Sequence, residues 1–183
     1  MFNFKAILHI IGILLILNGF FMASILPVSW YTNSTDFTAL LFSSGISINF
    51  GMVIWWLTRK VKKELSKRDG YIIVTLGWLV MGASGSLPFL LSGSIDSISS
   101  AFFETMSGYT TTGASIIENI ESLSPGIMLW RSMTQWIGGM GIIVLTVAIL
   151  PLLGVGGMEL FAAESPGPTS TKIHSKITDT AKR

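Results

Sequence analysis

Residues 107–115 read Ser-Gly-Tyr-Thr-Thr-Thr-Gly-Ala-Ser and lie between long hydrophobic stretches, directly behind a short apolar run. A cation that gives up its hydration water needs replacement oxygens at close range, and backbone carbonyls and threonine hydroxyls supply them. Gly113 permits the tight turn that brings such oxygens together. The motif therefore predicts an ion selectivity filter.

The residues before this motif, 98–108, have helical apolar spacing but a length of only about 16 Å at ~1.5 Å per residue. Such a half-helix dips into a bilayer without crossing it, and it is tolerated only where its end is buried or lines a water-filled cavity. Its carboxyl end, near Gly108, would direct the negative pole of the helix dipole at the filter. That polarity favours a cation.

The hydrophobic stretches on both sides of this region, together with the composition of the chain, indicate a membrane protein. Half of the residues are hydrophobic, 12% are charged and the mean hydropathy is +0.64. The stretches at about 6–26, 37–57, 71–91 and 126–150 approach or exceed the roughly 20 apolar residues that cross a bilayer. We expect an all-α integral membrane fold with two N-terminal transmembrane helices and one membrane–pore-loop–membrane unit, as in potassium channels.

The expected organisation has three parts. These are an N-terminal helix pair with a basic loop (1–70), the pore unit (71–153, with half-helix 98–108 and filter 109–115) and a cytoplasmic linker (154–183).

The sequence lacks the residues that several classes of function require. The chain has no cysteine, which excludes disulfides and thiolate metal sites. His9 and His174 form no recognisable ligand or nucleophile–base spacing, and no phosphate-binding glycine loop follows a strand pattern. The sequence pI is about 9.0, but the basic residues flank hydrophobic spans as topology signals do. We expect no enzyme, no organic cofactor and no nucleic-acid partner.

Charge also predicts orientation. The basic cluster of 58–70 consists of Arg59, Lys60, Lys62, Lys63, Lys67 and Arg68. Such a cluster faces the cytoplasm. Because four spans cross the membrane, both ends of the chain then lie in the cytoplasm as well. The opposite connections contain Asp36, Asp96, Glu118 and Glu121 without lysine or arginine. Acidic residues there either concentrate cations at the pore mouth or simply follow from the positive-inside bias.

Four polar side chains, one in the half-helix and three in the hydrophobic stretches, need an explanation. Glu104 either braces the filter by hydrogen bonding or contacts the ion, and Arg131 either pairs with an acidic residue or extends to the interface. We expect structural roles for both. Asn18 and Asn49 are expected to be buried and to tie helices together.

The motifs as a set resemble the TrkH type of the Trk/Ktr/HKT superfamily of potassium transporters. The resemblance rests on Ala101-Phe102-Phe103-Glu104 leading into 107–114, on Arg131-Ser132-Met133-Thr134-Gln135-Trp136-Ile137-Gly138-Gly139-Met140-Gly141-Ile142, on Ile149-Leu150-Pro151, on Gly154-Val155-Gly156-Gly157-Met158 and on Glu164-Ser165-Pro166-Gly167-Pro168. It extends over essentially the whole chain. The first two spans look like the extra N-terminal helix pair of the TrkH type.

This resemblance implies one of four pore units in a longer polypeptide, so we expect a truncated sequence that ends at Arg183. Thr111, Thr112 and Gly113 would give oxygens to potassium, with Thr110 lining the inner end of the filter. Potassium would enter through the bacterial inner membrane. A homodimer of the full-length protein, membrane lipid and a cytosolic nucleotide-binding regulator of the TrkA type would be the partners.

Two other interpretations stay open from the residues alone. The chain could be a non-conducting membrane subunit that anchors or assembles a partner and uses its Thr/Gly loop as a turn. It could also form a small homotetrameric cation channel by itself.

Overall fold

The computed structural model describes residues 3–59 and 67–152, and all regular structure within them is helical. The chain divides into two units, Met1–Leu145 and Thr146–Arg183, and residues 146–152 of the second are helical. The helices are α1 (Phe4–Ala23), α2 (Leu26–Tyr31), α3 (Phe37–Thr58), α4 (Lys67–Gly85), α5 (Leu87–Leu91), α6 (Ile98–Tyr109), the 3₁₀ turn η1 (Ile120–Ser122) and α7 (Pro125–Leu152). The expected all-α membrane fold is confirmed.

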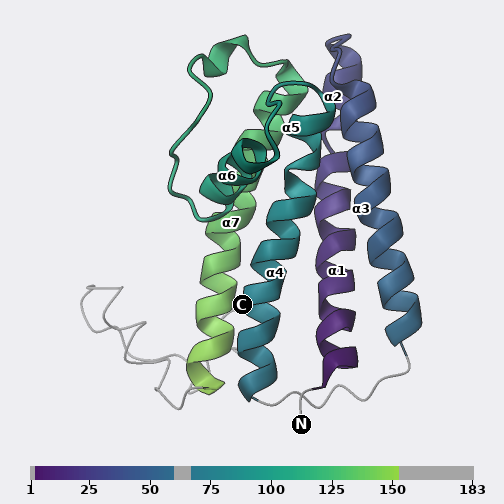
Figure 1. The fold of residues 1–183 in the computed structure, drawn as a ribbon, viewed down its shortest axis with the longest axis vertical. Helices are drawn as coiled ribbons and strands as arrows, with labels where there is room; N and C mark the ends of the chain where they lie inside the picture. Colours follow the sequence, from purple (N-terminus) through teal and green to yellow (C-terminus); the bar gives the residue numbers. More distant parts are fainter. Residues whose placement is uncertain (1–2, 60–66, 153–183) are drawn as a thin grey trace, which may run out of the picture. The chain divides into compact units, whose positions relative to one another are not determined.

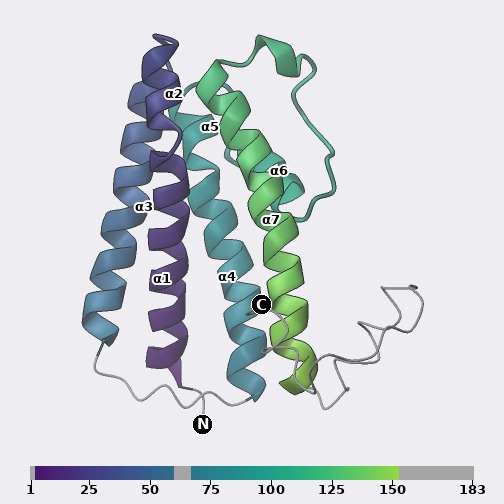
Figure 2. The same ribbon diagram turned by 180° about the vertical axis from the view of Figure 1, so that it is seen from behind.

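Among the described residues, three segments are long and apolar enough to cross a membrane. They are Phe4–Tyr31, Phe37–Thr58 and Asp69–Leu91, which match the first three predicted spans. The predicted fourth span, 126–150, lies within α7. Figures 1 and 2 show α3, α1, α4 and the first part of α7 side by side in that order.

Prolines break two of the spans near the same end of the first unit. Pro27 and Pro88 occupy the first turns of α2 and α5, where a missing backbone N–H costs nothing but the preceding helix cannot continue. The carbonyl of Gly85 at the second break accepts a hydrogen bond of 2.9 Å from the indole N–H of Trp130. The predicted first span, 6–26, ends directly before Pro27, whereas the predicted span 71–91 runs through Pro88, where the helix in fact breaks.

Helices α1 and α3 pack closely because glycines line their contact. A Cβ atom on Gly51 would lie 2.7 Å from the carbonyl oxygen of Gly12 and 2.8 Å from the backbone nitrogen of Ile16. Small residues allow helix backbones in a membrane to approach this closely, and dispersion contacts then replace the lipid contacts.

We expect Gly51→Leu to destabilise the N-terminal helix pair by about 1–3 kcal/mol, because the added side chain meets backbone that cannot move aside. The matched control is Gly45→Leu on the same helix, since nothing lies within 4 Å of a Cβ at Gly45. Thermal unfolding of the purified protein in mild detergent measures the difference. Equal melting temperatures for the two variants would contradict this packing.

Asp36 joins the N-terminal helix pair to α7 at the end of the unit that carries α2. Its carboxylate accepts hydrogen bonds from the backbone N–H of Ile127, at 3.0 Å, and from the hydroxyl of Ser29. Burial alone would raise the pKa of Asp36, but hydrogen bonds from Ser124, Ser29, Ser34 and Ile127 outweigh it and lower the pKa below 3.8. The ionised carboxylate thus satisfies one of the backbone N–H groups in the first turn of α7, that of Ile127.

Candidate cation-filter site

The site is built on α6, which begins at Ile98 as expected and ends at Tyr109, one residue beyond the predicted half-helix. It packs against α4 and α5 (Figure 1). Glycines on α4 make room for it, because a Cβ on Gly82 would lie 2.6 Å from the Met106 sulfur and one on Gly85 would lie 2.7 Å from the Thr105 methyl. The helix is therefore seated in a groove that larger side chains would close.

After α6 the backbone turns back on itself. The N–H groups of Thr112 and Gly113 both donate to the carbonyl oxygen of Ser107, at 3.0 and 3.4 Å, and that of Thr111 donates to Gly108 at 2.9 Å. Thr111 and Gly113 have φ angles of +57° and +74°. Left-handed backbone is costly for a β-branched residue such as threonine and is typical of functional sites.

This turn leaves a row of carbonyl oxygens free. No hydrogen bond among the described residues uses the carbonyl oxygens of Thr111, Thr112 or Gly113. The whole stretch 110–116 is exposed in the single chain. Residues 110–113, the filter segment, thus direct their N–H groups toward α6 and keep oxygens available for a ligand.

Glu104 links α6, α7 and the chain that follows the filter segment. Its Oε1 lies 2.6 Å from Nε of Arg131, and its carboxylate accepts hydrogen bonds from the Ser115 hydroxyl at 3.0 and 3.1 Å and from the Ile116 N–H at 2.9 Å. The Glu104 side chain is 1% exposed and that of Arg131 is 14% exposed. These contacts connect the Glu104 carboxylate to α7 and to the two residues, Ser115 and Ile116, that follow the filter turn.

Helix α7 touches the base of the filter segment through glycine. A Cβ on Gly138 would overlap the backbone carbonyl of Tyr109, and a Cβ on Gly108 would overlap the buried hydroxyl of Thr134. Thr134 belongs to the motif 131–142, but nothing in the sequence indicates its contact with Gly108. The close approach fixes α7 against the last turn of α6.

Other predicted residues lie away from the filter segment. His9 contacts the Thr58 hydroxyl at 3.0 Å, and the described residues contain no group of three metal-binding side chains. Asn18 is buried and connects helices, as expected. The expectation for Asn49 is wrong, because it is exposed and bonds the Gly45 carbonyl of its own helix. His174, the linker 154–183 and most of the basic loop lie outside the described residues.

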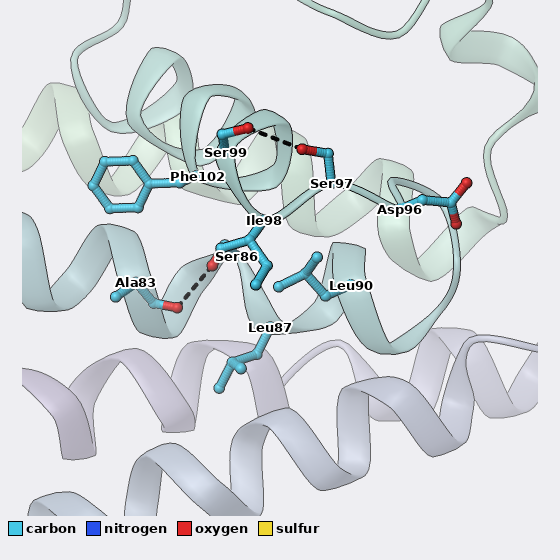
Figure 3. Close-up of a pocket in the computed structure, with 9 residues that line it drawn as sticks. All are labelled: Ala83, Ser86, Leu87, Leu90, Asp96, Ser97, Ile98, Ser99 and Phe102. Carbon is cyan, nitrogen blue, oxygen red and sulfur yellow. Dashed lines mark hydrogen bonds between the residues drawn. The ribbon is translucent and has the colours of Figure 1, made fainter.

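A groove of about 860 Å³ lies beside the α4–α5 break and the start of α6 (Figure 3). It is lined by Ala83, Ser86, Leu87, Leu90, Asp96, Ser97, Ile98, Ser99 and Phe102. Figure 3 shows Asp96 and the hydrogen-bonded pair Ser97 and Ser99 on the side away from Ala83. No residue of the filter segment belongs to the groove, so it is separate from the candidate site.

A half-length helix followed by backbone with free carbonyl oxygens, flanked by membrane helices, defines the class of pore-loop membrane proteins. Within that class, the chain belongs to the TrkH family of cation transport proteins, whose family model matches residues 38–182. It is not an enzyme.

Named relatives agree with this membership. The chain is 46% identical over 185 residues to the Trk system potassium uptake protein TrkH of Escherichia coli K12, covering 98% of this chain and 38% of the relative. The potassium uptake protein TrkG of the same organism is 32% identical over 180 residues, covering 97% and 37%. The crystal structure of the potassium transporter TrkH from Vibrio parahaemolyticus matches with a TM-score of 0.80 at 38% identity, covering 98% and 36%. The chain therefore spans less than two-fifths of the length of these relatives.

Proposed function

We propose that the protein takes up potassium through a channel-like pore in the bacterial inner membrane, with residues 110–113 as one of four filter segments. The observation that carries the proposal is the row of carbonyl oxygens at Thr111, Thr112 and Gly113, which accept no hydrogen bond from any residue that the structure describes. A turn in an anchoring subunit has no need for such a row. A relative with 46% identity is named a potassium uptake protein, which supports potassium as the ion.

In this proposal Thr111, Thr112 and Gly113 replace the hydration oxygens of potassium, and Thr110 lines the inner end. Glu104 and Arg131 brace the outer end through Ser115 and Ile116. The exposed side of the segment faces the pore axis, where three further segments complete the ion site. Inward movement draws about 2.3 kcal/mol per charge from each 100 mV of membrane potential.

The orientation and the partners belong to the same proposal. Lys5 and Arg59 lie near the end where α1 begins and α3 ends, while the opposite connections carry Asp36, Asp96, Glu118 and Glu121. The basic end is cytoplasmic and the acidic end forms the mouth. A TrkA-type nucleotide-binding regulator binds the cytoplasmic face, and the full-length protein pairs as a homodimer within membrane lipid.

The test replaces Gly113 by serine in the complete reading frame and measures rubidium uptake in potassium-starved cells that lack their own uptake systems. Because Gly113 has a φ of +74°, a side chain there strains the filter backbone, and we expect the preference for rubidium over sodium to fall about tenfold or more. Gly93→Ser is the matched control, since Gly93 has a φ of +70° in an outer loop with nothing within 4 Å of its Cβ. An unchanged preference in Gly113→Ser would refute the filter assignment.

A further inference from the structure

A buried hydrogen bond connects the first transmembrane helix to the residue that precedes the filter segment. Tyr109 is the last residue of α6 and is fully buried. Its hydroxyl donates to Oδ1 of Asn18 on α1 at 2.7 Å, across 91 positions of sequence. Asn18 is itself fully buried, so neither partner exchanges this bond for water.

Asn18 is held from a second side. Its Nδ2 donates to the hydroxyl of Ser84 on α4 at 2.6 Å. The amide therefore has one fixed orientation, with its oxygen directed at Tyr109 and its nitrogen at Ser84. A side-chain amide that is satisfied on both ends in a dry environment is strongly directional.

The Tyr109 ring also has little freedom to move. The Trp78 ring lies 6.3 Å away at a tilt of 58°, and a Cβ on Gly85 would lie only 2.9 Å from the Tyr109 hydroxyl. On the other side, the Tyr109 carbonyl is pressed against Gly138 of α7. Because Tyr109 is bonded directly to Thr110, the first residue of the filter segment, any displacement of the Tyr109 ring also displaces that segment.

We propose that Asn18 is a positioning residue for ion selectivity, which acts through the Tyr109 hydroxyl to fix the inner end of the filter segment. The proposal rests on the proposed function and extends it to the N-terminal helix pair. A phenylalanine at position 109 would pack equally well, so packing alone gives no reason for the hydroxyl. The directional hydrogen bond to Asn18 supplies that reason, because it fixes the position of the Tyr109 ring relative to α1.

The experiment compares Tyr109→Phe, Asn18→Leu and the double variant in the complete reading frame. Rubidium uptake and its inhibition by sodium are measured in potassium-starved cells, with the amount of protein in the membrane determined in parallel. We expect each single variant to lower the rubidium-to-sodium preference about two- to tenfold, the range that one hydrogen bond supports. The double variant should lose no more than the larger single loss, because both changes remove the same bond.

Asn49→Leu is the matched control, since Asn49 is exposed on α3 and bonds only the Gly45 carbonyl among the described residues. It should keep the parental preference. A parental preference in Tyr109→Phe at normal membrane abundance would overturn the proposal, and this variant decides the matter if Asn18→Leu does not accumulate. Failure of the parent to transport rubidium would overturn the proposed function as well, whereas altered selectivity in Gly113→Ser alone would overturn only the role of Asn18.

Discussion

Gly138→Ala should reduce rubidium uptake by the complete protein more than tenfold, although it adds a single methyl group. The new Cβ would overlap the backbone carbonyl of Tyr109, which cannot rotate away as a flexible side chain can. Either α7 moves outward or the last turn of α6 shifts, and overpacking of this kind costs about 1–3 kcal/mol or more. Because Thr110 follows Tyr109 directly, the shift displaces the filter segment.

The neighbouring glycine provides the control for Gly138→Ala. A Cβ on Gly139 would lie 3.8 Å from the Thr111 methyl, which is an ordinary contact. Gly139→Ala has the same change in composition and helix propensity at an adjacent position, so it should keep near-parental uptake. Uptake is measured per amount of protein in the membrane. Equal uptake by both variants would show that α7 does not press on the filter base as described.

Glu104→Gln should be the most destabilising conservative change in the site. Removing one charge of a buried pair leaves Arg131 without its partner, at a cost of about 3–5 kcal/mol. The glutamine retains one acceptor oxygen for the three donors that the carboxylate serves. We expect a lower melting temperature in detergent and a loss of potassium selectivity, because Ser115 and Ile116 lose part of their anchor.

Two further variants separate charge from position. Glu118→Gln neutralises an exposed carboxylate in the connection between α6 and α7, and it should change the melting temperature little. Exchanging the pair, Glu104→Arg with Arg131→Glu, restores opposite charges but puts a donor where the Ile116 N–H needs an acceptor. The exchange should therefore fail to recover stability. Recovery would mean that only the charge pair matters and that Glu104 does not hold the filter turn.

Much of the fold follows from local signals. The half-helix ends within one residue of its expected position, because its apolar spacing stops where the Thr/Gly chemistry begins. The predicted orientation of Asn49 is wrong, because α3 has polar residues on its buried side as well as on its exposed side and shows no single polar face. Its small residues Ser43, Ser47 and Gly51 recur at helical spacing and mark the buried side, and Asn49 does not lie on that side.

The contacts between side chains at the site are harder to predict from the sequence than the helices are. Glu104 and Arg131 were both candidates, but 27 positions separate them and no periodicity predicts that they pair. The bond from Tyr109 to Asn18 depends on how α1 crosses the pore unit. The positive φ of Thr111 has no signal at all, since a β-branched residue is the last choice for that conformation.

The most direct test of the account is to locate rubidium by anomalous X-ray scattering in crystals of the complete protein in which rubidium replaces potassium. We predict a rubidium site coordinated by the carbonyl oxygens of Thr111, Thr112 and Gly113. Rubidium bound elsewhere, with none at these oxygens, would contradict the assignment of residues 110–113 as a potassium filter.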